Sequence, residues 1–300
     1  MNSLIQIWRI TCYEWFTSIR SRRAIVVLLL FMAASVCTMN LTVNALQKME
    51  KELVKLLQLP ETEEVGVVSK TLWKSKPFQR MMKGIVKDKG IYNDIKGKHP
   101  VELMYGVLVF FYTPLLVVLV SANRIADDIG SGSLRYIAFR SSRFSWSFGK
   151  FIGQSGMIGL ALLLSGAGAW IVALVRLHEA GLPLLLNIMD WSIRSWIYAL
   201  PFLGLCMGLS HLTRSGSKAT IAGILAISVF FVLTILYRTY ENSEGWKAVF
   251  VYIATFIPEK HGGLLWRNNP VTLATGALWM ATLALCYLFL GYIYFRKRDI

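Results

Sequence analysis

Few side chains in this 300-residue chain have the types and spacing that catalysis requires. The four histidines and four cysteines are scattered, without zinc-ligand spacing and without the pairing pattern of a disulfide framework. Ser210 and His211 are adjacent, but a serine nucleophile needs a base, and no second histidine lies in a later apolar segment. We therefore interpret this pair as the polar end of a membrane helix and predict that the chain is not an enzyme.

The chain also lacks a phosphate-binding loop. Gly149 and Lys150 form the Gly-Lys pair of such a loop, but the upstream glycine is missing and Phe151 follows them. The third, fifth and sixth apolar segments defined below carry no charged residue in their interiors. Ion-driven carriers usually need charged groups inside the membrane. We therefore expect the energy for any transport to come from another protein.

The loop of residues 123–150 is unusual because it is polar and rich in turn residues; it reads NRIADDIGSGSLRYIAFRSSRFSWSFGK. Gly130 and Gly132 are expected to break the helix that enters it. Ser131 or Ser133 is then a suitable N-cap for a short helix. This helix is expected to run from Leu134 to about Phe139.

The charges of this loop are mostly basic. The loop has two acids, Asp127 and Asp128, and five basic residues: Arg124, Arg135, Arg140, Arg143 and Lys150. Leu134 and Ile137 share one side of the short helix. Arg140 and Arg143 are expected at its C-terminal end, where positive charge is stabilised by the helix dipole. The residues alone favour equally a docking helix for a soluble partner and a surface loop that contacts lipid phosphates.

The composition is that of a membrane protein. Apolar residues make up 55% of the chain and charged residues 16%, whereas soluble domains are about 45–50% apolar and about 25% charged. The net charge of +15 is interpreted as loop charge that sets topology, and we expect no nucleic-acid partner. The expected fold is all-α, in one permease-like domain over residues 1–300.

Six segments are long and apolar enough to cross the lipid bilayer as helices: 24–46, 101–122, 151–175, 192–212, 219–237 and 271–294. Basic residues gather before the first, between the second and third, between the fourth and fifth, and after the last. Because basic loops stay inside, both termini are expected in the cytoplasm and the chain in the cytoplasmic membrane. Close helix packing at Gly153, Gly156, Gly159, Gly204 and Gly208 is expected either within the chain or with a second copy.

Three flanking segments complete the predicted layout. Residues 1–23 carry an apolar stripe at helical spacing, which predicts an amphipathic helix on the inner membrane surface. Residues 47–100 are expected to be a small extracytoplasmic helical insert: the first span continues to Pro60, and a second helix ends at Gly90. Residues 246–257 are apolar but too short to cross, which favours a re-entrant or interfacial helix.

The loop sequence resembles a known family. Ser131-Gly132-Ser133-Leu134-Arg135-Tyr136, then Arg140-Ser141-Ser142-Arg143 and Gly149-Lys150, is similar to the coupling loop of type-2 ABC (ABC-2) exporter permeases, which show an acidic residue, S-G-T-L-R, R-x-S-R and G-K in this order. The six-span layout and the terminal FRKRDI extend the resemblance over most of the chain. The chain differs from the family pattern in three ways. Ser133 stands where the family has threonine, Asp127 or Asp128 stands where it has glutamate, and the 47–100 insert is long.

The resemblance implies the permease subunit of an ATP-driven exporter that works by alternating access. It implies two separate ATPase subunits that hydrolyse ATP, a second permease chain, and no cofactor bound directly. The resemblance implies that the loop contacts the ATPase. Leu134 and Ile137 would then be buried in this contact, and the arginines would orient the loop. The residues implied to couple are Asp127, Asp128, Gly132, Ser133, Leu134, Arg135, Ile137, Arg140, Arg143, Gly149 and Lys150.

An alternative is a membrane scaffold that does not transport and that displays the 47–100 insert to an extracytoplasmic partner. In that case deletion of residues 61–98 would abolish function, and pairing with an ATPase would be irrelevant. The sequence does not identify a substrate.

Overall fold

The computed structural model describes residues 3–57, 79–80, 84, 88–134, 141–177, 181–240 and 249–297. All regular secondary structure in these residues is helical. Six helices are long and apolar enough to span a membrane, so the expected all-α, six-span class is confirmed. The helices are apolar on most sides, which leaves many large apolar side chains for contact with lipid.

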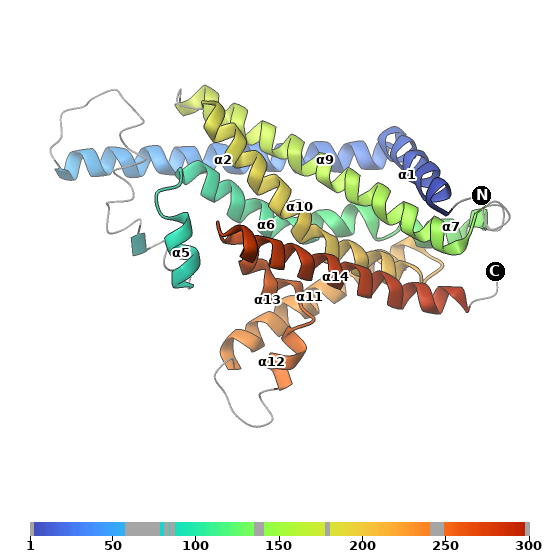
Figure 1. Cartoon of the computed structure of the whole chain (residues 1–300). Coiled ribbons are helices and arrows are strands. Elements are labelled where there is room, and N and C mark those ends of the chain that lie inside the picture. The colour runs from blue at the N-terminus through green and yellow to red at the C-terminus, as the bar shows by residue number, and fades with distance from the viewer. Residues whose placement is uncertain are drawn as a thin grey trace.

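The spans form one bundle (Figure 1). They are α2 (Arg22–Leu57), α6 (Pro100–Ser121) continued by α7 (Arg124–Gly130), α9 (Arg143–Leu177), α10 (Leu182–Ser210), α11 (Gly216–Tyr240) and α14 (Pro270–Arg296). Helix α10 packs against α6, α9 and α14, and α2 packs against α9 and α6. Helix α11 lies against α10 and is mostly exposed in the single chain.

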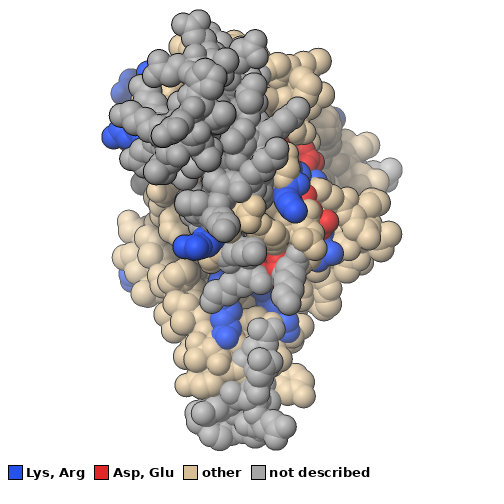
Figure 2. Space-filling model, turned by 90° about the vertical axis from the view of Figure 1, so that its left-hand side faces the viewer, with Lys and Arg blue, Asp and Glu red and all other residues tan. Residues whose placement is uncertain are grey.

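Both chain termini lie at one end of the bundle, together with α1 (Ser3–Arg20) and α7, and we call this the termini end (Figure 1). The opposite end carries α5 (Lys89–Ile95) and the 3₁₀ helix η2 (Gly263–Trp266). Figure 2 looks onto the opposite end, where acidic and basic side chains lie next to one another beside the residues drawn in grey. The two ends therefore both carry charge, separated by an apolar bundle.

Local sequence signals explain where the helices of the opposite end begin. His99 caps α6 by accepting from the Val101 amide, and Pro100 occupies the first turn as expected. The first span runs outward to Leu57, close to the predicted stop at Pro60. The prediction that a helix ends at Gly90 is wrong, because Asp88 caps a new helix there and accepts from the Gly90 and Ile91 amides.

The segment between the last two spans forms short helices instead of a span. Helix α12 (Val249–Ala254) and α13 (Pro258–Gly262) precede η2, so the predicted short apolar helix is present. Pro258 starts α13 and Gly262 ends it. Arg194 of α10 donates to the carbonyls of Leu265 (2.9 Å) and Arg267 (3.0 Å), which ties η2 to the bundle.

The glycines predicted to permit close packing face other helices of the same chain. A Cβ atom on Gly153 would lie 2.9 Å from Glu14 of α1, and one on Gly156 would lie 2.7 Å from Trp15. A Cβ on Gly204 or Gly208 would meet backbone carbonyls of α14. These glycines therefore serve packing within the chain.

Candidate functional site

The candidate site is the 123–150 loop with the elements around it at the termini end. The structure describes residues 123–134 and 141–150 of this loop. Arg135, Ile137 and Arg140 lie outside the described residues, so the short helix predicted over 134–139 stays a prediction. The described parts are the end of α7 and the beginning of α9.

The predicted break after the second span is present. Helix α7 ends at Gly130, and Gly132 has φ +72°, a left-handed conformation that glycine adopts without steric cost. The hydroxyls of Ser131 and Ser133 each donate to the Asp128 carbonyl at 3.2 Å. Ser131 therefore closes α7, which leaves Ser133 of the two residues expected to cap the next helix.

Lys150 is the centre of a buried ion cluster. Its Nζ lies 2.7 Å from Asp128 Oδ2 of α7 and 3.2 Å from Glu14 Oε2 of α1, and it donates to the Arg124 carbonyl at 3.3 Å. The residue is 7% exposed. Gly149 and Lys150 were expected where the chain re-enters the membrane, but α9 begins earlier, at Arg143, and both residues lie inside it. One ammonium thus joins three helices.

Helix α1 turns its polar side toward α9. Thr11, Glu14 and Ser18 are buried, and Gln154 of α9 donates to Glu14 Oε1 at 2.7 Å and to Ser18 Oγ at 3.2 Å. The predicted apolar stripe of α1 faces outward, with Leu4 76% exposed. An outward apolar face suits a membrane interface, although its placement on the membrane surface stays a prediction.

Sequence reasoning missed Glu14 and Gln154. A signal for Glu14 was present, because it is the only acidic residue among residues 1–23. Thr11 and Ser18 lie three and four residues from it, on one face of a helix. No comparable signal identifies Gln154, whose partners are far away in the chain.

Ser210 and His211 hold α10 to two other elements of the site. Ser210 Oγ accepts from the Ala126 amide at 2.9 Å, and His211 Nε2 is 2.9 Å from Ser147 Oγ. The other ring nitrogen of His211 lies 2.7 Å from the Met207 carbonyl. Burial lowers the pKa of His211 to about 4, so its ring is neutral at pH 7. Their interpretation as the polar end of the fourth span is confirmed.

Two further loop residues have different surroundings from those expected. Arg143 is the first residue of α9, and its Nη1 donates to the carbonyls of Arg296 (3.1 Å) and Phe295 (3.5 Å) at the C-terminus of α14. Leu134 is 2% exposed and belongs to the apolar core. Its side chain is therefore buried within this chain, whereas we expected it to face a partner.

Asp127 lines a hollow at the termini end. It accepts from Asn123 Nδ2 at 2.6 Å, and a cavity of about 330 Å³ lies between these residues and the start of α11. Its lining is mixed, with polar side chains from Asn123, Asp127 and Ser217 and the apolar side chain of Ile221. In the described part of the chain no group of His, Cys, Asp and Glu side chains could hold a metal ion.

The arrangement can transmit motion, since α9 is bonded to four other helices at this end. It reaches α1 and α7 through Lys150, α10 through Ser147, and α14 through Arg143. Displacement of the 123–150 loop would therefore move α9, and α1 with it.

The sequence matches the family described as ABC-2 family transporter protein over residues 8–247. The match includes most of α1, the 123–150 loop and the first five spans. No curated protein matches the sequence.

Proposed function

We propose that this chain, which belongs to the ABC-2 family of transporter membrane proteins, is the permease subunit of an ATP-driven exporter. In this proposal two separate ATPase subunits hydrolyse ATP, and a second permease chain completes the transport path. The chain itself binds no cofactor. The observation that carries the proposal is the buried Asp128–Lys150–Glu14 cluster, because it connects the 123–150 loop to the bundle.

Helix α9 is the element that would carry motion across the membrane. It is a continuous helix of 35 residues that starts within the loop and ends at Leu177. At about 1.5 Å per residue this length exceeds the roughly 30 Å of hydrocarbon. A push on α7 or on the start of α9 would therefore tilt a helix that reaches the opposite end. This motion would exchange inward-open and outward-open states.

The proposed orientation places the termini end in the cytoplasm. The short segments of this end carry many basic residues: Arg9, Arg20, Arg22, Arg124, Arg143, Lys150, Arg214, Lys218, Arg296 and Lys297. The 47–100 segment is also rich in Lys, but long loops cross the membrane largely regardless of their charge. Short loops rich in Lys and Arg stay on the cytoplasmic side. The ATPases would then meet the 123–150 loop and the hollow beside Asp127.

The test uses a photo-reactive amino acid at Ser131, an exposed residue of the loop. The full chain is expressed in its native host, membranes are irradiated, and cross-linked partners are identified by mass spectrometry. We expect an ABC ATPase cross-linked at Ser131. The matched control places the same amino acid at Lys96, an exposed residue of the opposite end, and we expect no ATPase there.

Two results would contradict the proposal. If an ATPase cross-links equally at Lys96, the orientation is wrong. If Ser131 captures no ATPase while the chain is abundant in the membrane, the loop is not the coupling site.

A further inference from the structure

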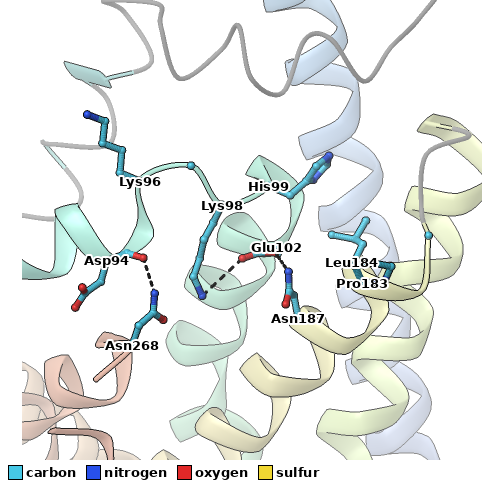
Figure 3. A pocket seen from close by; sticks show the side chains of 11 residues that line it. Asp94, Lys96, Lys98, His99, Glu102, Pro183, Leu184, Asn187 and Asn268 are labelled. Carbon is cyan, nitrogen blue, oxygen red and sulfur yellow. Dashed lines mark hydrogen bonds and ion pairs between the residues drawn. The ribbon is translucent and has the colours of Figure 1, made fainter. Parts of the chain in front are cut away.

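A cavity of about 630 Å³ lies at the opposite end, where α5, α6 and α10 meet the start of α14 (Figure 3). This volume is within the range of small-molecule sites, about 300–1,000 Å³. Its lining is mixed: Pro183 and Leu184 are apolar, whereas Lys98, Glu102 and Asn187 are polar. Figure 3 shows the Glu102 carboxylate between the ends of Lys98 and Asn187.

Glu102 is an incompletely satisfied carboxylate. The residue is fully buried, at 0% exposure. Its Oε2 accepts from Asn187 Nδ2 at 2.6 Å, but its Oε1 accepts no hydrogen bond. The nearest cation, Lys98 Nζ, is 3.7 Å from Oε1, too far for a hydrogen bond. A buried acceptor without a partner is costly, so this oxygen is suited to accept from a ligand.

Two other charged groups at this end, Asp94 of the cavity wall and the nearby Arg194, have close partners. Asp94 Oδ2 lies 2.6 Å from Arg267 Nε, and Asn268 donates to the Asp94 carbonyl at 2.8 Å. Arg194 lies 2.7 Å from Asp190. The walls are therefore held by their own contacts, and Glu102 Oε1 differs from them.

The carboxylate of Glu102 lies near two helix N-termini. The residue lies in the first turn of α6, and the N-terminus of α10 lines the same cavity. Helix N-termini stabilise negative charge nearby. A carboxylate oxygen that accepts no hydrogen bond can accept one from a cationic donor. A metal ion fits less well, since no group of three metal-ligating acidic, His or Cys side chains occurs among the described residues.

We propose that this cavity binds a ligand with a primary ammonium group, which donates to Glu102 Oε1, while Pro183 and Leu184 contact the ligand's aliphatic part. Lys98 competes with the ammonium for the same carboxylate. The inference goes beyond the proposed transport function, and it holds whether or not an ATPase drives the chain.

The experiment titrates the purified full chain in lipid nanodiscs with three fluorescent probes, without ATPase or ATP. All three carry a dansyl group on a short alkyl chain, which ends in an ammonium (dansylcadaverine), a hydroxyl or a carboxylate. We expect the ammonium probe to bind at least about tenfold more tightly than the others, because a charge-assisted hydrogen bond is lost with them. Unlabelled cadaverine should displace it.

Glu102→Gln keeps the size of the side chain and removes its charge. We expect this variant to bind the ammonium probe about tenfold more weakly, and to bind the hydroxyl probe with the same affinity as the wild type. Glu259→Gln is the matched control, because Glu259 of α13 also has a buried oxygen without a hydrogen-bond partner but does not line the cavity. Its affinity for the ammonium probe should equal that of the wild type.

Lys98→Met keeps the test decisive if Glu102→Gln does not fold. Removing the competing cation should tighten binding of the ammonium probe several-fold. The inference is overturned if Lys98→Met weakens binding, or if Glu102→Gln binds the ammonium probe as the wild type does. Equal signals from all three probes would indicate partition into the lipid, and would also overturn it.

Discussion

The two ends of the bundle differ in how closely their carboxylates are paired with cations. At the termini end, Glu14 and Asp128 lie 3.2 Å and 2.7 Å from the Lys150 ammonium, and Gln154 also binds Glu14. At the opposite end, Glu102 has one close hydrogen bond, from Asn187, and a cation 3.7 Å away. In the first cluster both carboxylates have a close cation, whereas Glu102, in the wall of a cavity, has an oxygen that accepts no hydrogen bond.

This difference indicates different tasks. A cation that contacts two carboxylates from different helices fixes the relative positions of those helices, and removing one partner of such a buried pair is costly. An unsaturated carboxylate beside a cavity holds little of the fold together and can exchange partners. We therefore assign mechanical coupling to the termini end and ligand contact to the opposite end.

The largest expected effect comes from Lys150→Met. It leaves Glu14 and Asp128 without their shared cation, and such a loss typically costs about 3–5 kcal/mol of unfolding free energy. Lys98→Met is its counterpart at the opposite end and should cost less, because Lys98 is partly exposed and its Nζ lies 3.7 Å from Glu102 Oε1. Thermal unfolding of both purified variants measures this. Equal destabilisation would remove the contrast between the ends.

A smaller effect is expected from acidification, through His211. Its pKa is about 4 in the folded chain against 6.5 for a free histidine, so between these values the unfolded chain binds more protons. Lowering the pH from 7.5 to 5 should therefore reduce the unfolding free energy by about 2 kcal/mol.

This pH dependence is measured as the slope of melting temperature against pH. His211→Gln should remove most of this slope. Burial also lowers the pKa of His99 at the opposite end, but this residue is less buried than His211. His99→Gln should therefore change the slope less. A wild-type slope that persists in His211→Gln would exclude His211 as its source.

The smallest effect concerns two arginines that are partly exposed. Arg143 donates to carbonyls at the C-terminus of α14, and Arg267 lies 2.6 Å from Asp94 at the opposite end. Arg143→Gln and Arg267→Gln should each cost about 0.3–1 kcal/mol in thermal unfolding, because water screens exposed charges. Similar small values would show that burial, and not the end of the bundle, decides the strength of these contacts. A loss above about 2 kcal/mol for either would contradict this.

Much of the fold could be predicted from the sequence because it depends on local patterns. Long apolar runs must be helices in lipid, and this identified all six spans. Gly130 and Gly132 marked the break after the second span, and Pro100 marked the start of α6. The glycines of α9 and α10 signalled close packing, although the sequence did not show which helix packs on them.

The candidate site could be predicted only in its location. The resemblance led to the 123–150 loop, but the burial of Leu134 and the place of Arg143 beside α14 were not expected. Both errors arose because the loop was read as an isolated surface segment. A side chain next to a turn is exposed or buried according to what packs over it, and that information is not local.

The sequence by itself determined the class of protein, its spans and the loop that distinguishes it, since hydropathy and turn chemistry act over a few neighbouring residues. Tertiary structure alone decided that Glu14 meets Lys150 and that Asn187 meets Glu102. These partners are 136 and 85 residues apart, as the differences of their numbers show. Their pairing depends on how apolar helices pack, and many packings bury the same apolar area. Polar partners inside the bundle therefore become visible only when the helices are in place.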